Sequence, residues 1–309
     1  MLIGIDIGGT KCAVVQGDRE MNILGKVRMD TGNAEETLKA IFDAVEAFGP
    51  CEAIGVSCGG PLDEERGVIC SPPNLPGWDD IHITEMLTER FKVPAYMRND
   101  ANACALAEWR YGAGKGTNNM VFLTFGTGMG AGLILNGALY SGTNGNAGEV
   151  GHMRLERFGP VGYGKMGSLE GFCSGGGMAQ LGKMLAERHL QTGAKLPYKK
   201  DEITAKLLAE QARFGDPVAC ETFRITGEKL GAALSLMIDM LNPEAIVIGS
   251  VFARSEDLLR AHAERVIREE ALPQNSRVCR ILPAALGEKI GDIAALTVAA
   301  EGLRNEELC

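Results

Sequence analysis

The chain has 309 residues, of which 45% are hydrophobic and 23% charged, and its formal net charge is −9. This composition is typical of a soluble globular protein with one large domain or two medium ones. The negative charge argues against a nucleic-acid or anionic-membrane partner, because both require a basic surface.

The N-terminus and the cysteines favour a cytoplasmic protein. Residues 1–10 lack a basic region and carry Asp6 within the apolar run, which does not fit a signal peptide. No uninterrupted apolar stretch reaches the roughly 18 residues of a transmembrane helix. The nine cysteines are scattered and none forms a C-x-x-C pair, as expected for reduced thiols.

The first part of the chain predicts three strands, a helix and further strands. Apolar runs at 2–6, 11–16 and 23–29 are joined by turn residues, and 35–48 has apolar residues at helical spacing. Residues 52–57 indicate a buried strand. A further strand ends at Met97, before a helix that runs through Trp109.

The second half repeats this order. Strands are predicted at 120–125, 133–135 and 138–140, and a long helical pattern at 221–241 precedes a strand at 245–248. The repeat predicts an α/β fold of two similar lobes, with glycine-rich turns facing each other across a central cleft. We place the lobes at 1–115 and 116–291, and expect a C-terminal helix at about 292–309 to pack on the first lobe.

Two glycine-rich turns follow strands at matching places of the repeat. In the first, DIGGTK at 6–11, consecutive glycine N–H groups can form an anion-binding nest, and Asp6 could hold a metal ion through water. In the second, GTGMG at 126–130, the same device recurs. Each alone could be a plain β-turn, but the pair predicts a phosphate site.

Other common chemistries are not supported. A Rossmann fingerprint opens a helix, whereas GTGMGAG precedes a predicted hairpin, and the chain has no Walker A pattern. The chain has four histidines and no G-x-S-x-G, so a serine or cysteine nucleophile lacks support. Any nucleotide would therefore be held by paired hairpin turns.

Asp100 follows Asn99 at the start of a predicted helix. Its simplest interpretation is an N-cap. The helix N-terminus would also keep its carboxylate ionised in a closed site. There it could orient a substrate hydroxyl and accept its proton during phosphoryl transfer.

Several polar residues could bind a sugar through paired hydrogen bonds to its hydroxyls. Asn74 lies in the proline-rich segment 71–78, which could also be a surface turn with Trp78 as a core plug. The spacing does not show that the members of this set meet. The set comprises Asn74, Asn99, Asp100, Glu149, His152 and Glu170.

Six segments together resemble the ROK family of sugar kinases and repressors, in the hexokinase/actin-like ATPase superfamily with its ribonuclease H-like fold. They are DIGGTK, SPPNLPGW, RNDANACALAE, GTGMGAGLILNG, GNAGEVGH and AIVIGS, in the family's order over nearly the whole chain. The resemblance implies phosphorylation of a hexose by ATP, usually at the 6-hydroxyl, with Mg²⁺. Glucose is the first candidate, and kinases for N-acetylglucosamine, N-acetylmannosamine, fructose or allose share most of these motifs.

The resemblance also implies roles for single residues. Asp100 would be the catalytic base, and the other members of the polar set would bind the sugar. Gly249 would belong to the adenosine site, although Ser250 stands where the family usually has a second glycine. The two phosphate loops would comprise Asp6, Gly8, Gly9, Thr10 and Lys11, and Gly126, Thr127 and Gly128.

The largest departure from the family lies at VGYGKMGSLE, residues 161–170. The family has three cysteines here that bind a structural zinc with a histidine, and this chain has none of the three. Zinc prefers four N/S ligands, which His152 and Cys173 alone do not supply. We therefore predict no structural zinc, and expect an apolar cluster in its place, formed by Phe158, Val161, Tyr163 and Met166.

Two further expectations concern the class of protein. Repressors of the family carry an extra N-terminal helix-turn-helix that binds DNA. Here the first predicted strand begins at Leu2, which leaves no room for such a segment, so an enzyme is favoured. A non-catalytic sugar-sensing module is the second hypothesis, against which Asp100 and both phosphate turns count. The resemblance to the family also suggests that the protein forms a homodimer.

Overall fold

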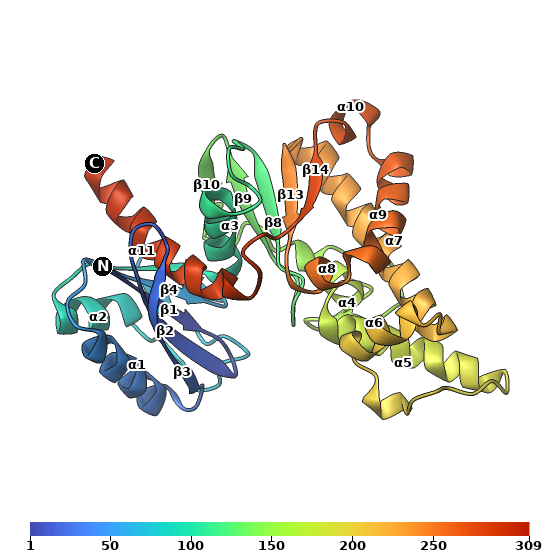
Figure 1. The fold of residues 1–309 in the computed structure, drawn as a ribbon, viewed down its shortest axis with the longest axis horizontal. Helices are drawn as coiled ribbons and strands as arrows, with labels where there is room; N and C mark the ends of the chain where they lie inside the picture. Colours follow the sequence, from blue (N-terminus) through green and yellow to red (C-terminus); the bar gives the residue numbers. More distant parts are fainter. Residues whose placement is uncertain (309) are drawn as a thin grey trace.

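The computed structural model describes residues 1–308 and contains two five-stranded sheets (Figure 1). The first has the strand order β3-β2-β1-β4-β7 and the second the order β10-β9-β8-β13-β14. The strands of the first sheet are β1 (Leu2–Ile7), β2 (Lys11–Gly17), β3 (Ile23–Asp30), β4 (Ala53–Cys58) and β7 (Ala95–Asn99). Those of the second are β8 (Met120–Leu123), β9 (Ala131–Leu135), β10 (Ala138–Tyr140), β13 (Ala245–Ile248) and β14 (Arg280–Pro283).

The two sheets have the same connectivity. In each, three consecutive strands form an antiparallel meander, and two later strands add in parallel beside the first strand of the meander. Each sheet forms its own lobe, as Figure 1 shows. The predicted duplicated α/β fold is therefore confirmed.

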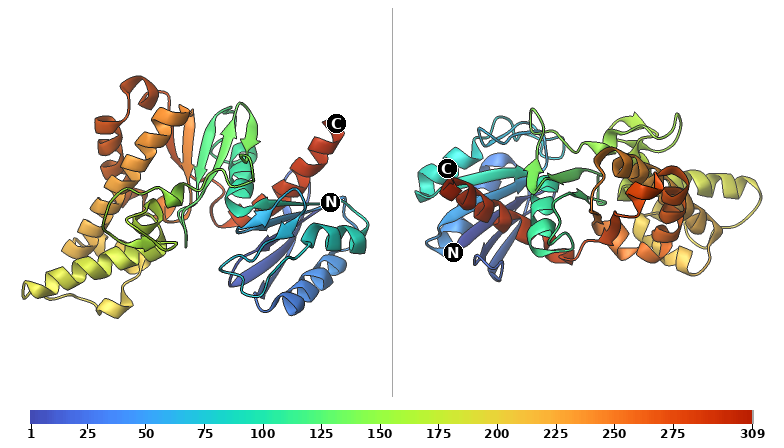
Figure 2. Two further views of the ribbon diagram at one scale, coloured as in Figure 1. Left: turned by 180° about the vertical axis from the view of Figure 1, so that it is seen from behind. Right: turned by 90° about the horizontal axis from the view of Figure 1, so that it is seen from above.

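Helices cover both faces of the first sheet. On one face α1 (Ala34–Phe48) and α2 (Ile83–Phe91) pack on the sheet with β1 and β4 residues such as Ile5 and Val56. On the other face α11 (Ile290–Leu308) lies across β1 and β4 (Figure 2). This close packing needs glycine, because a Cβ on Gly55 would lie 2.2 Å from the Ala295 carbonyl oxygen. The C-terminal helix thus packs on the sheet of the first lobe.

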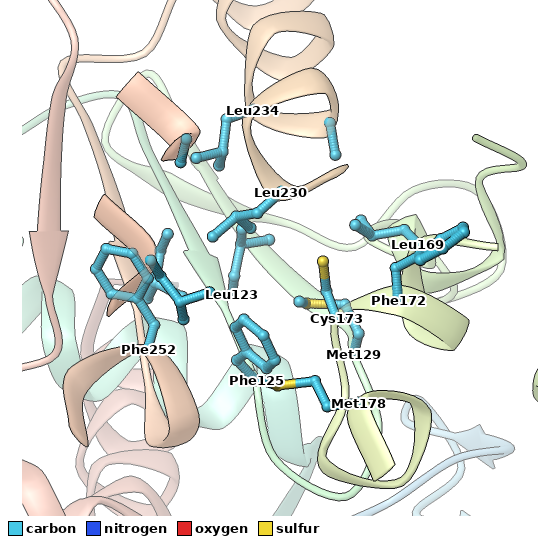
Figure 3. Packing of buried hydrophobic residues seen from close by; sticks show 14 of the residues in the cluster. Leu123, Phe125, Met129, Leu169, Phe172, Cys173, Met178, Leu230, Leu234 and Phe252 are labelled. Atoms are coloured by element: carbon cyan, nitrogen blue, oxygen red, sulfur yellow. The ribbon is translucent and has the colours of Figure 1, made fainter. Parts of the chain in front are cut away.

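The second lobe has a larger helical layer. Its helices are α4 (Leu169–Phe172), α5 (Gly175–Gln191), α6 (Ala205–Arg213), α7 (Pro217–Leu241), α8 (Ser250–Arg254), α9 (Glu256–Glu270) and α10 (Pro273–Ser276). Figure 3 shows the core between this layer and β8, where Leu123 and Phe125 meet Leu230 of α7 and Phe252 of α8. Phe172 and Cys173 lie in the same core.

Helix α3 (Asp100–Tyr111) lies between the two lobes. Ala103 and Ala107 pack in one core with α11, while Leu106 and Trp109 pack on the second sheet. The chain passes between the lobes at 112–119 and again at 284–289. The boundaries drawn from the sequence stay a prediction. Over the described residues, no helix is long and apolar enough to span a membrane.

Candidate active site

The ends of three neighbouring strands bring the site of the first lobe together. Ile7 of β1 lies opposite Cys58 of β4, and Cys58 lies opposite Asn99 of β7, in parallel pairs. The segments that follow these strands therefore open on one sheet edge, where ligands bind in α/β folds. They are the turn at Gly8, the turn at Gly59 and the start of α3 at Asp100.

The first predicted phosphate loop is a tight turn between β1 and β2. The Gly8 N–H donates to the Lys11 carbonyl at 3.1 Å, and the Thr31 N–H donates to the Thr10 carbonyl at 3.0 Å. Gly9 packs closely against Asn74, a sugar-binding candidate, because a Cβ on Gly9 would be 2.6 Å from the Asn74 carbonyl oxygen. The Thr10 and Lys11 side chains are exposed, so the turn holds these two residues through their backbone.

Asn74 is held by its neighbours in the 71–78 loop. Leu75 and Trp78 are buried, and the Trp78 Nε1–H donates to the Gly32 carbonyl at 3.4 Å. The prediction that the Trp78 side chain packs in the core is therefore confirmed. Asn74 itself is exposed. An ideal Cβ on Gly59 would lie 3.7 Å from Asn74 Nδ2 and 3.8 Å from Asp100 Oδ2. The structure thus brings the Asn74 and Asp100 side chains together beside Gly59.

The expected N-cap role of Asp100 is wrong. Asn99 is the N-cap of α3, since its extended backbone lets Oδ1 accept from the Ala101 N–H at 3.0 Å. Asp100 is the first residue of the helix, and its own Oδ1 accepts from the same N–H at 2.8 Å. The sequence could not separate the two, because both Asn and Asp are good caps.

Asp100 is exposed to solvent, although many protein atoms lie near its carboxylate. Burial raises its pKa, and the hydrogen bond from the Ala101 N–H opposes that rise only in part. Burial therefore outweighs this hydrogen bond in its effect on the pKa of Asp100, and the expectation that Asp100 stays ionised remains a prediction. A raised pKa makes the carboxylate a stronger base, which suits proton transfer from an alcohol.

Asp6 lies among like charges beside this site. Burial raises the pKa of Asp6 to about 6, helped by Asp100 and Asp292 and opposed by Lys26. Lys26 is itself paired with Asp292. The group therefore holds three carboxylates against one ammonium, an excess of negative charge that a bound cation would relieve.

The candidates of the second lobe surround its own glycine loop. Glu170 Oε2 accepts from the Met129 N–H at 3.0 Å, and a Cβ on Gly128 would lie 2.8 Å from that oxygen. Glu149 precedes the 3₁₀ turn η1 (Val150–His152), and His152 is its last residue. Burial raises the pKa of Glu149, His152 opposes the rise, and Asp100 and Glu170 add to it. Glu149 thus lies within electrostatic reach of the predicted base and of both other candidates.

Gly126, Thr127 and Gly128 lie next to two helix starts. The Gly175 N–H at the start of α5 donates to the Gly126 carbonyl at 2.8 Å, and a Cβ on Gly126 would be 3.6 Å from Ser250 Oγ. Gly249 precedes α8, and Ser250 has φ +49°, in the left-handed region that favours glycine. This backbone geometry explains why a second glycine would suit position 250.

The sequence interpretation missed two parts of this site. Gly59 and Gly60 lie between Asn74, Asn99 and Asp100, and the signal was CGGP directly after a buried strand. The second part is the short hairpin of β5 (Leu62–Asp63) and β6 (Val68–Ile69), which carries Glu64. Its two-residue strands leave no periodicity to recognise.

The expected apolar cluster at the knuckle, residues 153–168, is wrong. Phe158, Val161, Tyr163 and Met166 are 79%, 39%, 63% and 45% exposed. Here β11 (Val161–Gly162) and β12 (Lys165–Met166) form a hairpin whose turn residues Tyr163 and Gly164 both have positive φ. The hairpin packs on α4 through the buried backbone of Gly162, and its large side chains remain at the surface.

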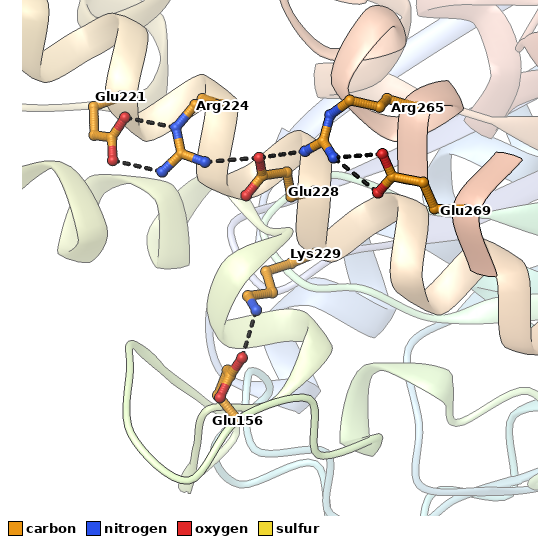
Figure 4. Close-up of polar contacts among 7 residues, drawn as sticks. All are labelled: Glu156, Glu221, Arg224, Glu228, Lys229, Arg265 and Glu269. Carbon is orange, nitrogen blue, oxygen red and sulfur yellow. Dashed lines mark hydrogen bonds and ion pairs between the residues drawn. The ribbon is translucent and has the colours of Figure 1, made fainter. Parts of the chain in front are cut away.

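Hydrogen bonds hold the knuckle instead. Gln180 of α5 bonds both the N–H and the carbonyl of Val161, at 3.1 and 3.0 Å. Lys165 Nζ donates to the His152 carbonyl at 2.5 Å, and the His152 and Tyr163 rings meet edge to face at 5.3 Å. Lys229 of α7 pairs with Glu156 beside a chain of ion pairs that joins α7 to α9 (Figure 4).

Cys173 is buried and its sulfur lies 3.6 Å from the Thr226 carbonyl oxygen. Among residues 1–308, no three or more histidine, cysteine, aspartate or glutamate side chains are grouped to hold a metal ion. The absence of a structural zinc stays a prediction.

Comparisons with known proteins agree with this geometry. The chain is 32% identical over 314 residues to a glucokinase of Streptomyces coelicolor, covering 97% of this chain and 98% of that protein. The crystal structure of a ROK family glucokinase from Streptomyces griseus, in complex with glucose and AMPPNP, is 32% identical with a TM-score of 0.79. That match covers 97% of this chain and 99% of the other, so the predicted actin-like ATPase fold is confirmed.

Repressors are related to the chain as well. A xylose repressor of Caldicellulosiruptor bescii is 28% identical, and the match covers 87% of this chain and 70% of the repressor. The model of the ROK family matches residues 2–301. The chain therefore belongs to the ROK family.

Proposed function

We propose that this chain, an ATP-dependent sugar kinase, transfers the γ-phosphoryl group of MgATP to the 6-hydroxyl of a hexose, with glucose as the first candidate. The observation that carries the proposal is the position of Asp100. Its carboxylate and the Asn74 side chain both lie beside Gly59, at the sheet edge that also holds the Gly8–Gly9 turn. Full-length similarity to glucokinases supports the same reaction.

In this proposal the site residues divide by role. Asp100 takes the proton of the hydroxyl that attacks phosphorus. Asn74, Asn99, Glu149, His152 and Glu170 bind the other hydroxyls. The phosphates are bound by backbone N–H groups of the two glycine loops other than those of Gly8 and Gly126, which bond within their own turns. Gly249 borders the adenosine.

Mg²⁺ would supply charge neutralisation for the phosphates, and the residues present fit such an ion. Mg²⁺ in kinases is held by one or two carboxylates together with substrate phosphates and water. Asp6 provides a carboxylate at the first phosphate turn, in a group with excess negative charge. Such a cation would lower the pKa of Asp6 and keep it ionised at neutral pH.

A second candidate function is a non-catalytic sugar-sensing module, which the relatedness to xylose repressors favours. Retention of Asp100 and of both glycine loops supports the kinase. N-acetylglucosamine, N-acetylmannosamine, fructose and allose remain alternative substrates.

The decisive experiment is an ADP-release assay with MgATP over a panel of hexoses, paired with calorimetric sugar binding. The kinase proposal expects turnover with at least one hexose and a new 6-phosphate in the product. Measurable sugar binding without any turnover would instead identify a sensing module.

A further inference from the structure

The hairpin of β5 and β6 places an acidic side chain beside the predicted catalytic base. Glu64 lies in the turn of this hairpin, which follows directly after Gly59 and Gly60. Its side chain is only 10% exposed, in a turn where Glu65 and Arg66 are exposed. A carboxylate this well covered requires partners to offset the loss of hydration.

The partners of Glu64 lie on both sides of Asp100. Glu64 Oε1 accepts from the Asn99 backbone N–H at 2.7 Å and lies 3.4 Å from Asn102 Nδ2. Glu64 Oε2 lies 3.4 Å from Arg98 Nη1. One carboxylate therefore contacts the end of β7 and the first turn of α3.

The sheet topology explains why this contact is needed. β7 is an edge strand of its sheet, so its outward N–H groups require partners from outside the sheet. Glu64 supplies one at Asn99, where the strand becomes a helix. A negative charge is also favourable at a helix N-terminus.

We propose that Glu64 is a positioning residue that fixes Asn99 and Asp100 for the reaction. The inference rests on the proposed function, in which Asp100 is the base and Asn99 a sugar ligand. Without Glu64 the Asn99 N–H loses a charge-assisted hydrogen bond, and the strand-to-helix junction becomes free to shift. A displacement of about 1 Å at a catalytic group can lower a rate by about 100-fold.

The test compares Glu64→Ala and Glu64→Gln with Glu65→Ala, which removes an exposed glutamate from the same turn. We expect Glu64→Ala to lower kcat by roughly 10- to 100-fold and to raise KM for the sugar, while KM for MgATP stays within about twofold. Glu64→Gln keeps an acceptor oxygen and should recover part of the activity. Glu65→Ala should match the unchanged protein.

Hydrogen exchange provides a second readout that does not depend on turnover. Peptides that contain Asn99 and Asp100 should exchange faster in Glu64→Ala than in Glu65→Ala, with other segments unchanged. Unchanged exchange at this junction would overturn the proposal. The proposal would also be overturned if Glu64→Ala lowered Vmax only in proportion to the fraction of protein that is unfolded and left the sugar KM unchanged. If the unchanged protein turns over no hexose, the kinase proposal fails, while hydrogen exchange and sugar binding still decide the role of Glu64.

Discussion

Asp100 joins two properties that a general base needs, a carboxylate open to substrate and a pKa that burial raises. Asp100→Asn keeps the size of the side chain but removes the proton acceptor. We expect kcat to fall by roughly 10²- to 10⁴-fold, while calorimetric sugar affinity changes by less than about threefold. Asp43→Asn, an exposed change on α1, is the control. Substantial activity in Asp100→Asn would mean that another group takes the proton.

Asp6 predicts a pH dependence of stability. Burial and repulsion raise its pKa from 3.8 to about 6, so the folded state binds this proton more tightly than the unfolded state. The unfolding free energy should therefore fall as the pH rises from about 4 to above 6, by about 3 kcal/mol at most. Asp6→Asn removes the charge and should raise the unfolding free energy by about 1–3 kcal/mol at pH 7.5 and by little at pH 4. The same change should weaken MgATP binding.

Urea unfolding of both proteins at pH 4 and pH 7.5 measures this difference. A variant that is less stable than the unchanged protein at pH 7.5 would show that the Asp6 charge is well compensated in the fold. Retained MgATP affinity in Asp6→Asn would separately contradict the proposed role in metal binding.

At the scale of elements, the knuckle predicts stability that does not depend on metal. The hairpin of β11 and β12 is tied to α5 by the two hydrogen bonds of Gln180. We expect a chelator to leave Tm unchanged and metal analysis to find no stoichiometric zinc. Gln180→Ala should lower the unfolding free energy by about 1 kcal/mol, whereas Gln191→Ala at the exposed end of α5 should not. Bound zinc, or a Tm that falls with chelator, would refute the prediction.

The long elements could be predicted from the sequence because each carries a strong period. The apolar spacing of α1 and the buried run of β4 extend over enough residues to identify a helix and a strand. The knuckle could not be predicted in this way. Its large apolar residues suggested a cluster, but only the short hairpin decides which way Tyr163 and Met166 point.

Part of the candidate site could be expected from the sequence, because Gly8, Gly9 and Asp100 follow strand ends. Parallel pairing of β1, β4 and β7 then aligns those ends without further information. Glu64 was not predicted, since its role depends on a contact between a two-residue strand pair and a helix start. The spacing of residues in the sequence does not predict that contact.

At the scale of the whole molecule, one buried glutamate joins the two passages of chain between the lobes. Glu108 of α3 is fully buried. Its carboxylate accepts from the Ala113 N–H at 2.8 Å in the first passage. It also accepts from the Ala285 and Leu286 N–H groups, at 3.2 and 2.9 Å, in the second. Both passages are therefore fixed to the helix that packs between the two sheets.

This arrangement predicts that Glu108 sets both the stability and the relative placement of the lobes. Glu108→Gln replaces one acceptor oxygen by an NH₂ group that faces a backbone N–H, which should lower the unfolding free energy by about 2 kcal/mol. The lobes bind sugar and nucleotide between them in the proposed reaction, so KM for both substrates should rise. Glu89→Gln, an exposed change on α2, is the control for urea unfolding and kinetics. If Glu108→Gln lost stability but kept both KM values, the glutamate would hold the chain without setting how the lobes meet.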